Sequence, residues 1–168
     1  MKTIRIFIAA VFVLAAQFSN AQSKSYKMYD AFSNMDGVTN FSFTKNMTDA
    51  FNIDLGDKGD EKNVTGDLHE IRFMSYNPKK GNLSGSEFTK KAVALLSSKY
   101  KKYVDENNED DDAKIYLLGG KKKFKECHVF ITNENDNQMR FVVSFYGDFN
   151  VKDLDGLKKT GQEFSDEE

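Results

Sequence analysis

Three segments with apolar residues at every second position follow one another in the second half of the chain, and they constrain the fold more than any other feature. They span residues 114–118, 124–132 and 139–149. In the third, Met139, Phe141, Val143 and Phe145 lie at alternate positions, which is the period of a β-strand. The connections are short and rich in Gly or Asn. Because strands joined by short turns pair in opposite directions, these segments predict an antiparallel meander.

The first half of the chain adds two predicted strands, at 38–44 and 68–77. A long helix is expected over 84–104, because Ser84 is followed three residues later by Glu87, the pattern of a capping box, and apolar residues then recur at helical spacing. Further helices are expected at 23–35, 45–53 and 151–159, the second of them short or only a turn.

This order of elements, α-β-α-β-α-β-β-β-α, predicts an α+β fold. We expect a single domain over residues 22–158, in which a mixed, largely antiparallel sheet of about five strands packs against the long helix. The residues from 159 to 168 are acidic and are predicted to form a disordered tail.

Residues 1–21 have the features of a secretory signal peptide. Lys2 and Arg5 precede an apolar run, and Ser19-Asn20-Ala21 places small residues at the −3 and −1 positions of a cleavage site. The run is short for a bilayer, which disfavours an N-terminal membrane anchor. No Cys follows it directly, so we expect no lipid attachment. The mature protein is therefore predicted to be exported, periplasmic or secreted, and soluble after cleavage.

Composition excludes several classes of function. The whole chain has one Cys, two His and a formal net charge of −2. A single Cys forms neither an intrachain disulfide nor a thiolate metal cluster. Proteins that bind nucleic acids are usually clearly basic, so no nucleic-acid partner is expected. Cys127 lies in an alternating segment without a placeable basic neighbour, which favours a small core residue over a catalytic thiolate.

The two histidines are the first candidates for a metal or catalytic site. Glu70 and Glu126 stand near His69 and His128 in the sequence, but neighbours on a strand point to opposite faces. A zinc site also needs further ligands. We therefore expect both histidines to be isolated residues at the surface or boundary of the domain, and we predict no metal, cofactor or catalytic residue.

Two acidic stretches are candidates for calcium binding. One runs from Asp105 to Asp112, and the other contains Asp54, Asp57, Asp60 and Glu61. Neither has the ligand spacing of a calcium loop, so solvated loops are the preferred interpretation, with weak cation binding as the alternative.

Other short motifs are also weak. Gly119-Gly120-Lys121 lacks the first Gly and the Ser or Thr of a phosphate-binding loop, and a hairpin turn explains it better. The chain has no Gly-x-Ser-x-Gly motif. Lys121-Lys122-Lys123 is interpreted as a solvated turn rather than a contact for anionic lipid. Glycosylation sequons occur at Asn40, Asn46, Asn63 and Asn82, and they matter only in a host that glycosylates.

The chain resembles a group of small exported bacterial proteins catalogued as domain of unknown function 4252. The resemblance spans roughly residues 26–158 and rests on four motifs, which are Met28-Tyr29-Asp30 with Asp36-Gly37-Val38-Thr39, Phe41-Ser42-Phe43-Thr44-Lys45 with Met47, Ile71-Arg72-Phe73-Met74-Ser75, and Gly147-Asp148-Phe149-Asn150-Val151-Lys152-Asp153-Leu154. It implies an exported α+β domain and assigns no activity. This chain lacks the lipobox Cys that many members carry.

The leading hypothesis from the sequence is a non-enzymatic exported module that binds an envelope or secreted protein, or an apolar ligand between sheet and helix. Strand addition at an exposed sheet edge is one docking mode. Two alternatives stay open. One is a hydrolase whose site is assembled from non-adjacent carboxylates, and the other is a structural or stress-linked envelope component. The oligomeric state is left open.

Overall fold

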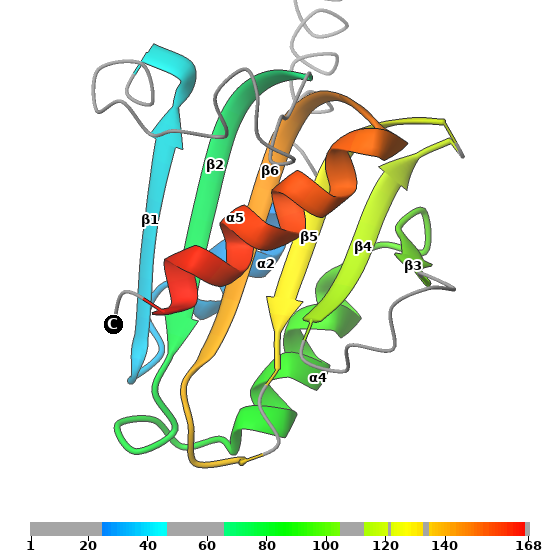
Figure 1. The fold of residues 1–168 in the computed structure, drawn as a ribbon. Coiled ribbons are helices and arrows are strands. Elements are labelled where there is room, and N and C mark those ends of the chain that lie inside the picture. Colours follow the sequence, from blue (N-terminus) through cyan, green and yellow to red (C-terminus); the bar gives the residue numbers. More distant parts are fainter. Residues whose placement is uncertain (1–24, 47–65, 105–112, 121, 133–134, 167–168) are drawn as a thin grey trace, which may run out of the picture.

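A six-stranded antiparallel sheet with the order β1-β2-β6-β5-β4-β3 forms the centre of the molecule (Figure 1). The computed structural model describes residues 25–46, 66–104, 113–120, 122–132 and 135–166. The strands are β1 (Val38–Thr44), β2 (Asp67–Tyr76), β3 (Lys101–Tyr103), β4 (Ala113–Gly119), β5 (Lys123–Ile131) and β6 (Arg140–Asn150). The five predicted strands and the meander are confirmed. The described sheet is entirely antiparallel rather than mixed, and β3 was not predicted.

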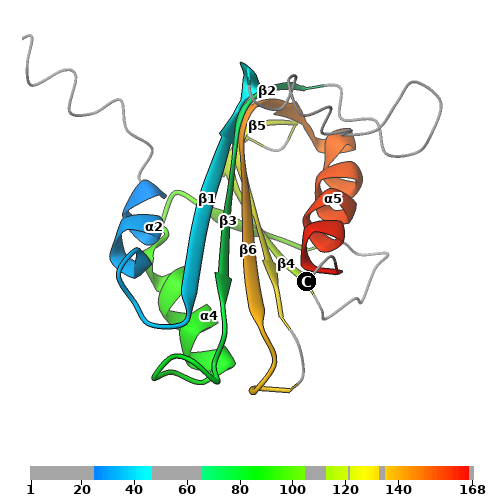
Figure 2. The same cartoon turned by 90° about the vertical axis from the view of Figure 1, so that its left-hand side faces the viewer.

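Helices cover both faces of the sheet (Figure 2). Helices α2 (Tyr26–Phe32) and α4 (Gly85–Leu95) lie on one face, called here the α2–α4 face. Helix α5 (Leu154–Asp166), reached through the 3₁₀ turn η1 (Val151–Asp153), lies on the opposite face, called here the α5 face. The α+β class is confirmed, but the sheet is sandwiched between two helix layers, whereas one packed face was predicted.

Each face of the sheet has its own apolar core. On the α5 face, Leu154 and Leu157 of the last helix pack with strand residues that include Phe145 and Val129. On the α2–α4 face, the buried residues are Met28, Tyr29, Phe32, Met74, Tyr76, Phe88, Ala92, Phe130 and Val142. There the ring of Tyr76 stacks on that of Phe88 with centroids 4.6 Å apart. Burial of apolar surface on both faces explains why strand residues of β5 and β6 are apolar on both sides.

Helix α4 begins as predicted and ends earlier. The capping box is present, because the amide of Glu87 donates to Ser84 Oγ over 3.2 Å and the amide of Ser84 donates to the Glu87 carboxylate over 2.9 Å. The helix ends at Leu95, and Leu96 is extended. The predicted continuation to residue 104 is wrong, because Lys101–Tyr103 forms β3 and pairs with β4. The lysines at 99, 101 and 102 have the spacing expected for the solvated side of a helix. The conformation of Lys101 and Lys102 is instead set by the pairing of β3 with β4.

The last helix is longer than predicted. Helix α5 runs to Asp166, so most of the segment predicted to be a disordered tail is helical. Thr160 is buried, and a Cβ atom at Gly161 would lie 3.3 Å from the Val129 side chain. Contact with the sheet therefore stabilises a sequence that looks polar in isolation. The predicted signal peptide and the acidic linker at 105–112 lie outside the described residues, as does most of the predicted element at 45–53.

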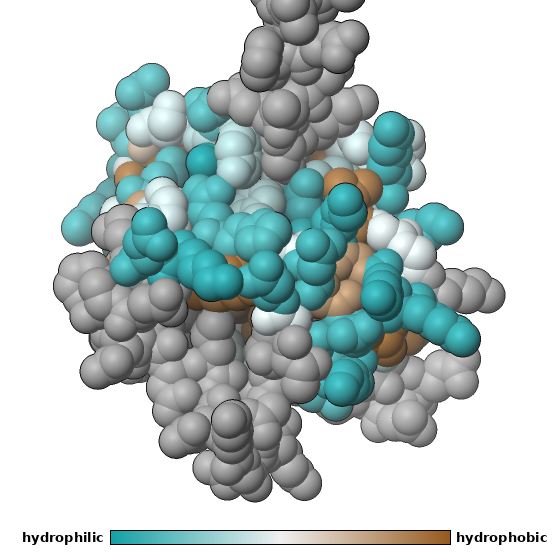
Figure 3. Space-filling view, turned by 90° about the horizontal axis from the view of Figure 1, so that it is seen from above, coloured by the Kyte–Doolittle hydropathy of each residue, from teal (hydrophilic) through white to brown (hydrophobic). Residues whose placement is uncertain are grey.

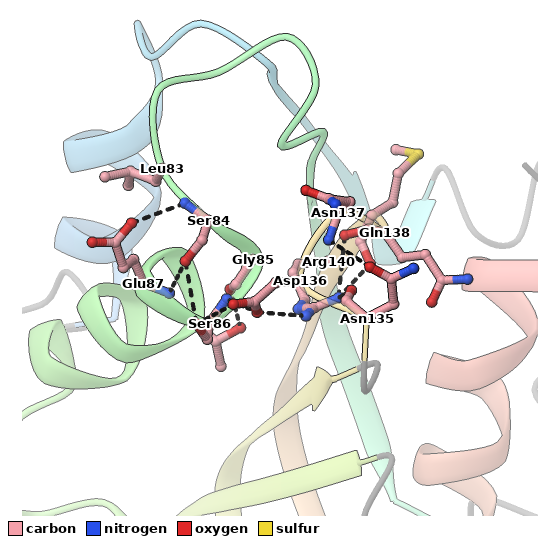
Figure 4. A network of polar contacts seen from close by, with 12 residues as sticks. Leu83, Ser84, Gly85, Ser86, Glu87, Asn135, Asp136, Asn137, Gln138 and Arg140 are labelled. Carbon is pink, nitrogen blue, oxygen red and sulfur yellow. Dashed lines mark hydrogen bonds and ion pairs between the residues drawn. The ribbon is translucent and has the colours of Figure 1, made fainter.

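The turn between β5 and β6 holds the start of α4 (Figure 4). The Asp136 carboxylate accepts hydrogen bonds from the amide and the hydroxyl of Ser86, both at 2.9 Å, and the Asp136 carbonyl accepts one from the amide of Gly85. Arg140 pairs with the same carboxylate at 3.3 Å. A Cβ atom at Gly85 would lie 2.6 Å from the Arg140 guanidinium, so glycine permits this approach. These bonds satisfy free amides of the helix N-terminus and fix α4 against the sheet.

Candidate functional site

A buried polar network lies under helix α2 on the α2–α4 face. Its centre is formed by Glu126 and His128 of β5 and by Ser144 and Tyr146 of β6. Ser25 and Tyr29 reach it from the start of α2, and Tyr100 reaches it from the segment after α4. Each of these side chains belongs to a residue with less than a tenth of its surface exposed. This is the largest group of buried polar side chains among the described residues, and it is the first candidate for a functional site.

The carboxylate of Glu126 is the main acceptor in this network. It accepts hydrogen bonds from the hydroxyl of Tyr100 at 2.7 Å and from Ser25 at 3.0 Å. The hydroxyls of Ser25 and Tyr146 are 2.9 Å apart. Since Ser25 donates its proton to Glu126, Tyr146 donates to Ser25. A buried carboxylate is tolerated only with such partners, because desolvation of an unpaired charge is costly.

His128 connects Glu126 with β6 and α2. Its Nδ1 lies 2.6 Å from Ser144 Oγ, and its Nε2 lies 3.4 Å from the Glu126 carboxylate. The hydroxyl of Tyr29 donates to Ser144 Oγ over 2.7 Å. In the neutral tautomer that fits these distances, Ser144 donates to Nδ1, and Nε2 lies near Glu126 without a hydrogen-bond partner. Serine, histidine and glutamate thus lie in one row, in which the serine–histidine contact is a hydrogen bond and the histidine–glutamate contact is not.

Burial controls the protonation of this network. Desolvation lowers the pKa of His128, while the nearby Glu126 carboxylate acts in the opposite direction. Desolvation also raises the pKa values of Tyr29 and Tyr146. The site therefore holds a neutral imidazole among protonated phenols. Protonation of His128 would turn Nδ1 into a donor, and Ser144 would then accept from both His128 and Tyr29 while its own proton lost its acceptor.

We expect the stability of the domain to fall as the pH is lowered below 6.5, the ordinary pKa of histidine. The folded state holds His128 at a lower pKa than the unfolded chain does, so the unfolded state binds more protons in this range. Urea unfolding at pH values on both sides of 6.5 measures how the free energy of unfolding changes with pH, and His128→Gln provides the comparison. The free energy of unfolding of the variant should depend less on pH. An identical pH dependence in both proteins would show that His128 does not contribute to it.

The network continues to the surface through an ion pair. Arg72 Nε lies 2.8 Å from the carboxylate of Glu70, two residues earlier on β2. The Arg72 guanidinium stacks on the ring of Tyr26, 3.5 Å from its centroid, and Tyr26 donates a hydrogen bond to Glu70. Desolvation and this bond raise the pKa of Tyr26 to about 12. The charges of Glu70 and Arg72 compensate each other, so this outer part joins α2 to β2 and presents no single-sign charge to a ligand.

The histidine prediction was half right. His69 is exposed and lies 3.3 Å from Asp67, as expected for a surface residue. For His128 the prediction was wrong, because its side chain is fully buried. The argument about opposite faces also fails for Glu126, which is two residues from His128 rather than adjacent and therefore lies on the same face. Within the described ranges, no group of three or more His, Cys, Asp or Glu is placed to hold a metal ion.

The other candidate residues from the sequence are a cysteine, a pair of glycines and two acidic stretches. Cys127 is a free thiol in the core of the α5 face, as predicted, and burial raises its pKa. Gly119 and Gly120 form the turn between β4 and β5, where the amide of Gly120 donates to the carbonyl of Lys123, so the hairpin interpretation is confirmed. The acidic stretch at 105–112 and the residues Asp54, Asp57, Asp60 and Glu61 lie outside the described residues.

The second candidate site is the outer edge of β1. In the described part of the chain, β1 pairs with β2 alone and lies at the end of the strand order. Among the residues that the structure describes, Phe41 of this strand is one of three large apolar residues with substantial exposure, at 39%. Most of the described surface is hydrophilic in the view from above, where apolar surface shows only in small areas (Figure 3). The edge of β1 therefore presents one exposed aromatic side chain beside its backbone groups.

Comparison with models of protein families shows which family the chain belongs to. The family model described as "Domain of unknown function (DUF4252)" matches residues 26–157. The chain belongs to this family. The matched region of the DUF4252 family begins at the first residue of α2 and ends within α5, so it includes the whole described sheet and every residue of the buried network except Ser25. No curated protein and no solved structure matches the chain. Among the described residues, no helix is both long and apolar enough to cross a membrane.

Proposed function

We propose that this protein is an exported, non-enzymatic binding module that takes up an extended polypeptide segment at the outer edge of β1. The observation that carries the proposal is a seven-residue strand edge that is regular, uncharged and unpaired within the described residues. Export is supported by the signal-peptide pattern at residues 1–21. Strand addition uses main-chain hydrogen bonds for affinity and side chains on the two faces for specificity.

The backbone of β1 shows which groups face a partner. The amide of Asn77 donates to the carbonyl of Gly37 over 2.8 Å, and Gly37 extends the β1–β2 register by one position. Residues of an antiparallel strand alternate between bonding to one neighbour and to the other. Gly37, Phe41 and the other odd-numbered residues therefore bond to β2. The amides and carbonyls of Asn40, Ser42 and Thr44 point outward to a partner strand.

Edge strands are usually protected against such pairing, and within the described residues β1 lacks three of the common protective features. Charged residues, proline and β-bulges are the usual devices. The strand Val38–Thr44 contains no charged residue and no proline, and its register with β2 runs without a shift. On the α5 face, the ring of Phe41 stacks on Phe73 with centroids 4.5 Å apart and remains partly exposed. This ring provides an apolar contact beside the polar edge.

Proline at position 42 should abolish strand addition without unfolding the domain. Ser42→Pro removes an outward amide from the middle of the edge and leaves the bonds to β2 in place, and proline is tolerated on edge strands. The matched control is Ser42→Ala, which keeps the amide. The probe is a soluble peptide of alternating valine and threonine flanked by lysine.

An NMR titration with this peptide measures the effect. We expect the amide signals of Asn40, Ser42 and Thr44 to shift in the wild type and in Ser42→Ala, and Ser42→Pro to bind at least about tenfold more weakly, a loss of roughly 1.4 kcal/mol. Circular dichroism checks the fold of each variant. Absence of binding to the wild type, or equal binding to folded Ser42→Pro, would contradict the proposal.

A hydrolase is the enzymatic alternative, and the alignment of Glu126, His128 and Ser144 is the observation in its favour. Two features speak against it. His128 and Ser144 are fully buried, so a substrate would have to displace α2. The Ser144 hydroxyl also accepts a hydrogen bond from Tyr29, which makes its oxygen a weaker nucleophile. The network is better suited to holding α2, α4 and the sheet together, as a scaffold for the binding edge.

A further inference from the structure

We propose that the segment bound at the β1 edge is β1 of a second copy of this chain. This inference rests on the proposed function and names its partner. The two β1 strands run antiparallel about a twofold axis beside Phe41, so that the two sheets join into one continuous sheet. A twofold contact of this kind uses the same surface on both copies and closes on itself.

The outward backbone groups set the register. Because the even-numbered residues point outward, they must face one another across the new pair. A twofold axis at Phe41 places Asn40 opposite Ser42 of the second copy, and Val38 opposite Thr44 of the second copy. This register spans Val38–Thr44 on both sides, with the amide of Val38 already donating to the carbonyl of Met35 in its own chain. A shift of the axis by one residue to Asn40 or Ser42 would leave unpaired residues at the strand ends.

The side chains are self-complementary in this register. On the α5 face, Phe41 of one copy lies next to Phe41 of the other, and Thr39 lies next to Phe43 of the second copy. Aromatic pairs and aromatic–threonine pairs are among the stabilising cross-strand combinations. The exposed part of the Phe41 ring, which is 39% exposed in the single chain, would be covered by the symmetry mate.

Charge does not oppose the pairing of two β1 strands. The strand itself carries no charge that repels its own copy. Lys45, which follows β1, is bound within its own chain, because its Nζ lies 2.6 Å from the Asp67 carboxylate.

The opposite edge of the sheet explains why the assembly would stop at two copies. The strand β3 has three residues, and two of them are Lys101 and Lys102, both exposed. A short edge with lysines is protected against further pairing. The asymmetry between the protected β3 edge and the unprotected β1 edge is the pattern expected of a closed dimer, whereas two open edges would lead to fibres.

Sedimentation velocity of the purified protein over a range of concentrations tests the inference. We expect a concentration-dependent dimer for the wild type. Asn40→Lys/Ser42→Lys should be monomeric, because the two lysines of each copy face those of the other. Asn40→Asp/Ser42→Asp should be monomeric for the same reason. An equal mixture of the two variants should form a dimer, since every Lys then faces an Asp.

Matched controls carry the same charges away from β1. Ala94→Lys/Ser98→Lys and Ala94→Asp/Ser98→Asp change exposed positions in and after α4 and should dimerise like the wild type. A monomeric wild type at all concentrations would overturn the dimer, and the binding of the valine–threonine peptide would then still support the proposed function. A dimer that persists in both charged variants, or a mixture that stays monomeric, would overturn the β1 register.

Discussion

Glu126→Ala should destabilise the domain by about 3–5 kcal/mol, the usual cost of removing one partner from a buried charged network. The carboxylate of Glu126 accepts from Tyr100 and Ser25 and lies 3.4 Å from His128 Nε2. Alanine would leave these donors buried without their acceptor, and water would not easily replace it. The lost contacts join α2, the segment after α4 and β5, so the effect should be on global unfolding rather than on one element.

Urea unfolding monitored by circular dichroism measures this loss. Glu126→Gln keeps an acceptor oxygen and should be less destabilised than Glu126→Ala. Asp148→Ala is the matched control, because Asp148 is an exposed acid on β6, and its free energy of unfolding should stay within about 0.5 kcal/mol of the wild type. If Glu126→Ala unfolded at the same urea concentration as Asp148→Ala, the network would not stabilise the fold.

Gly147→Ala should also be strongly destabilising, by about 3 kcal/mol. A Cβ atom at this position would lie 2.2 Å from the Asp67 carbonyl oxygen and 2.9 Å from the ring of Phe149. The first of these is backbone of β2 and cannot rotate away. Gly147 faces Leu68 next to an irregularity in the β2–β6 register, and β5 and β6 also shift register nearby, between Phe124 and Glu126. Alanine would force these strands apart next to the two register shifts.

The matched control for this substitution is Gly120→Ala, in the turn between β4 and β5. A Cβ atom there would lie 3.8 Å from the Lys123 carbonyl oxygen, which is an ordinary contact. Thermal unfolding of both variants provides the comparison, and Gly120→Ala should remain close to the wild type. Equal melting temperatures for the two variants would show that the sheet relaxes around the added methyl group.

Local patterns predicted most of the elements, because alternation and helical spacing are properties of short segments. The strands at 38–44 and 124–132 were recognised by alternating apolar residues, and Ser84 with Glu87 marked the start of α4. The end of that helix was missed. Lys101 and Lys102 fit a helix surface as well as a strand edge, and only their pairing with β4 distinguishes the two.

The buried network shows a different limit. Glu126 and His128 are two residues apart, so their shared face on a strand was available as a signal. Their partners were not, because Ser144 and Tyr29 are brought together across a sequence separation of 115 residues. No local spacing predicts a contact that depends on the order of strands in the sheet and on a helix laid across them.

The sequence alone determined the α+β class, the antiparallel meander, the core position of Cys127 and the relationship to a family. These follow from periodicity, residue type and motifs, which are local properties of the sequence. The tertiary structure decided which strand lies at the edge, which polar residues are buried together and how far α4 and α5 extend. These depend on contacts between distant segments, because strand order and burial are settled only when the two helix layers close over the sheet.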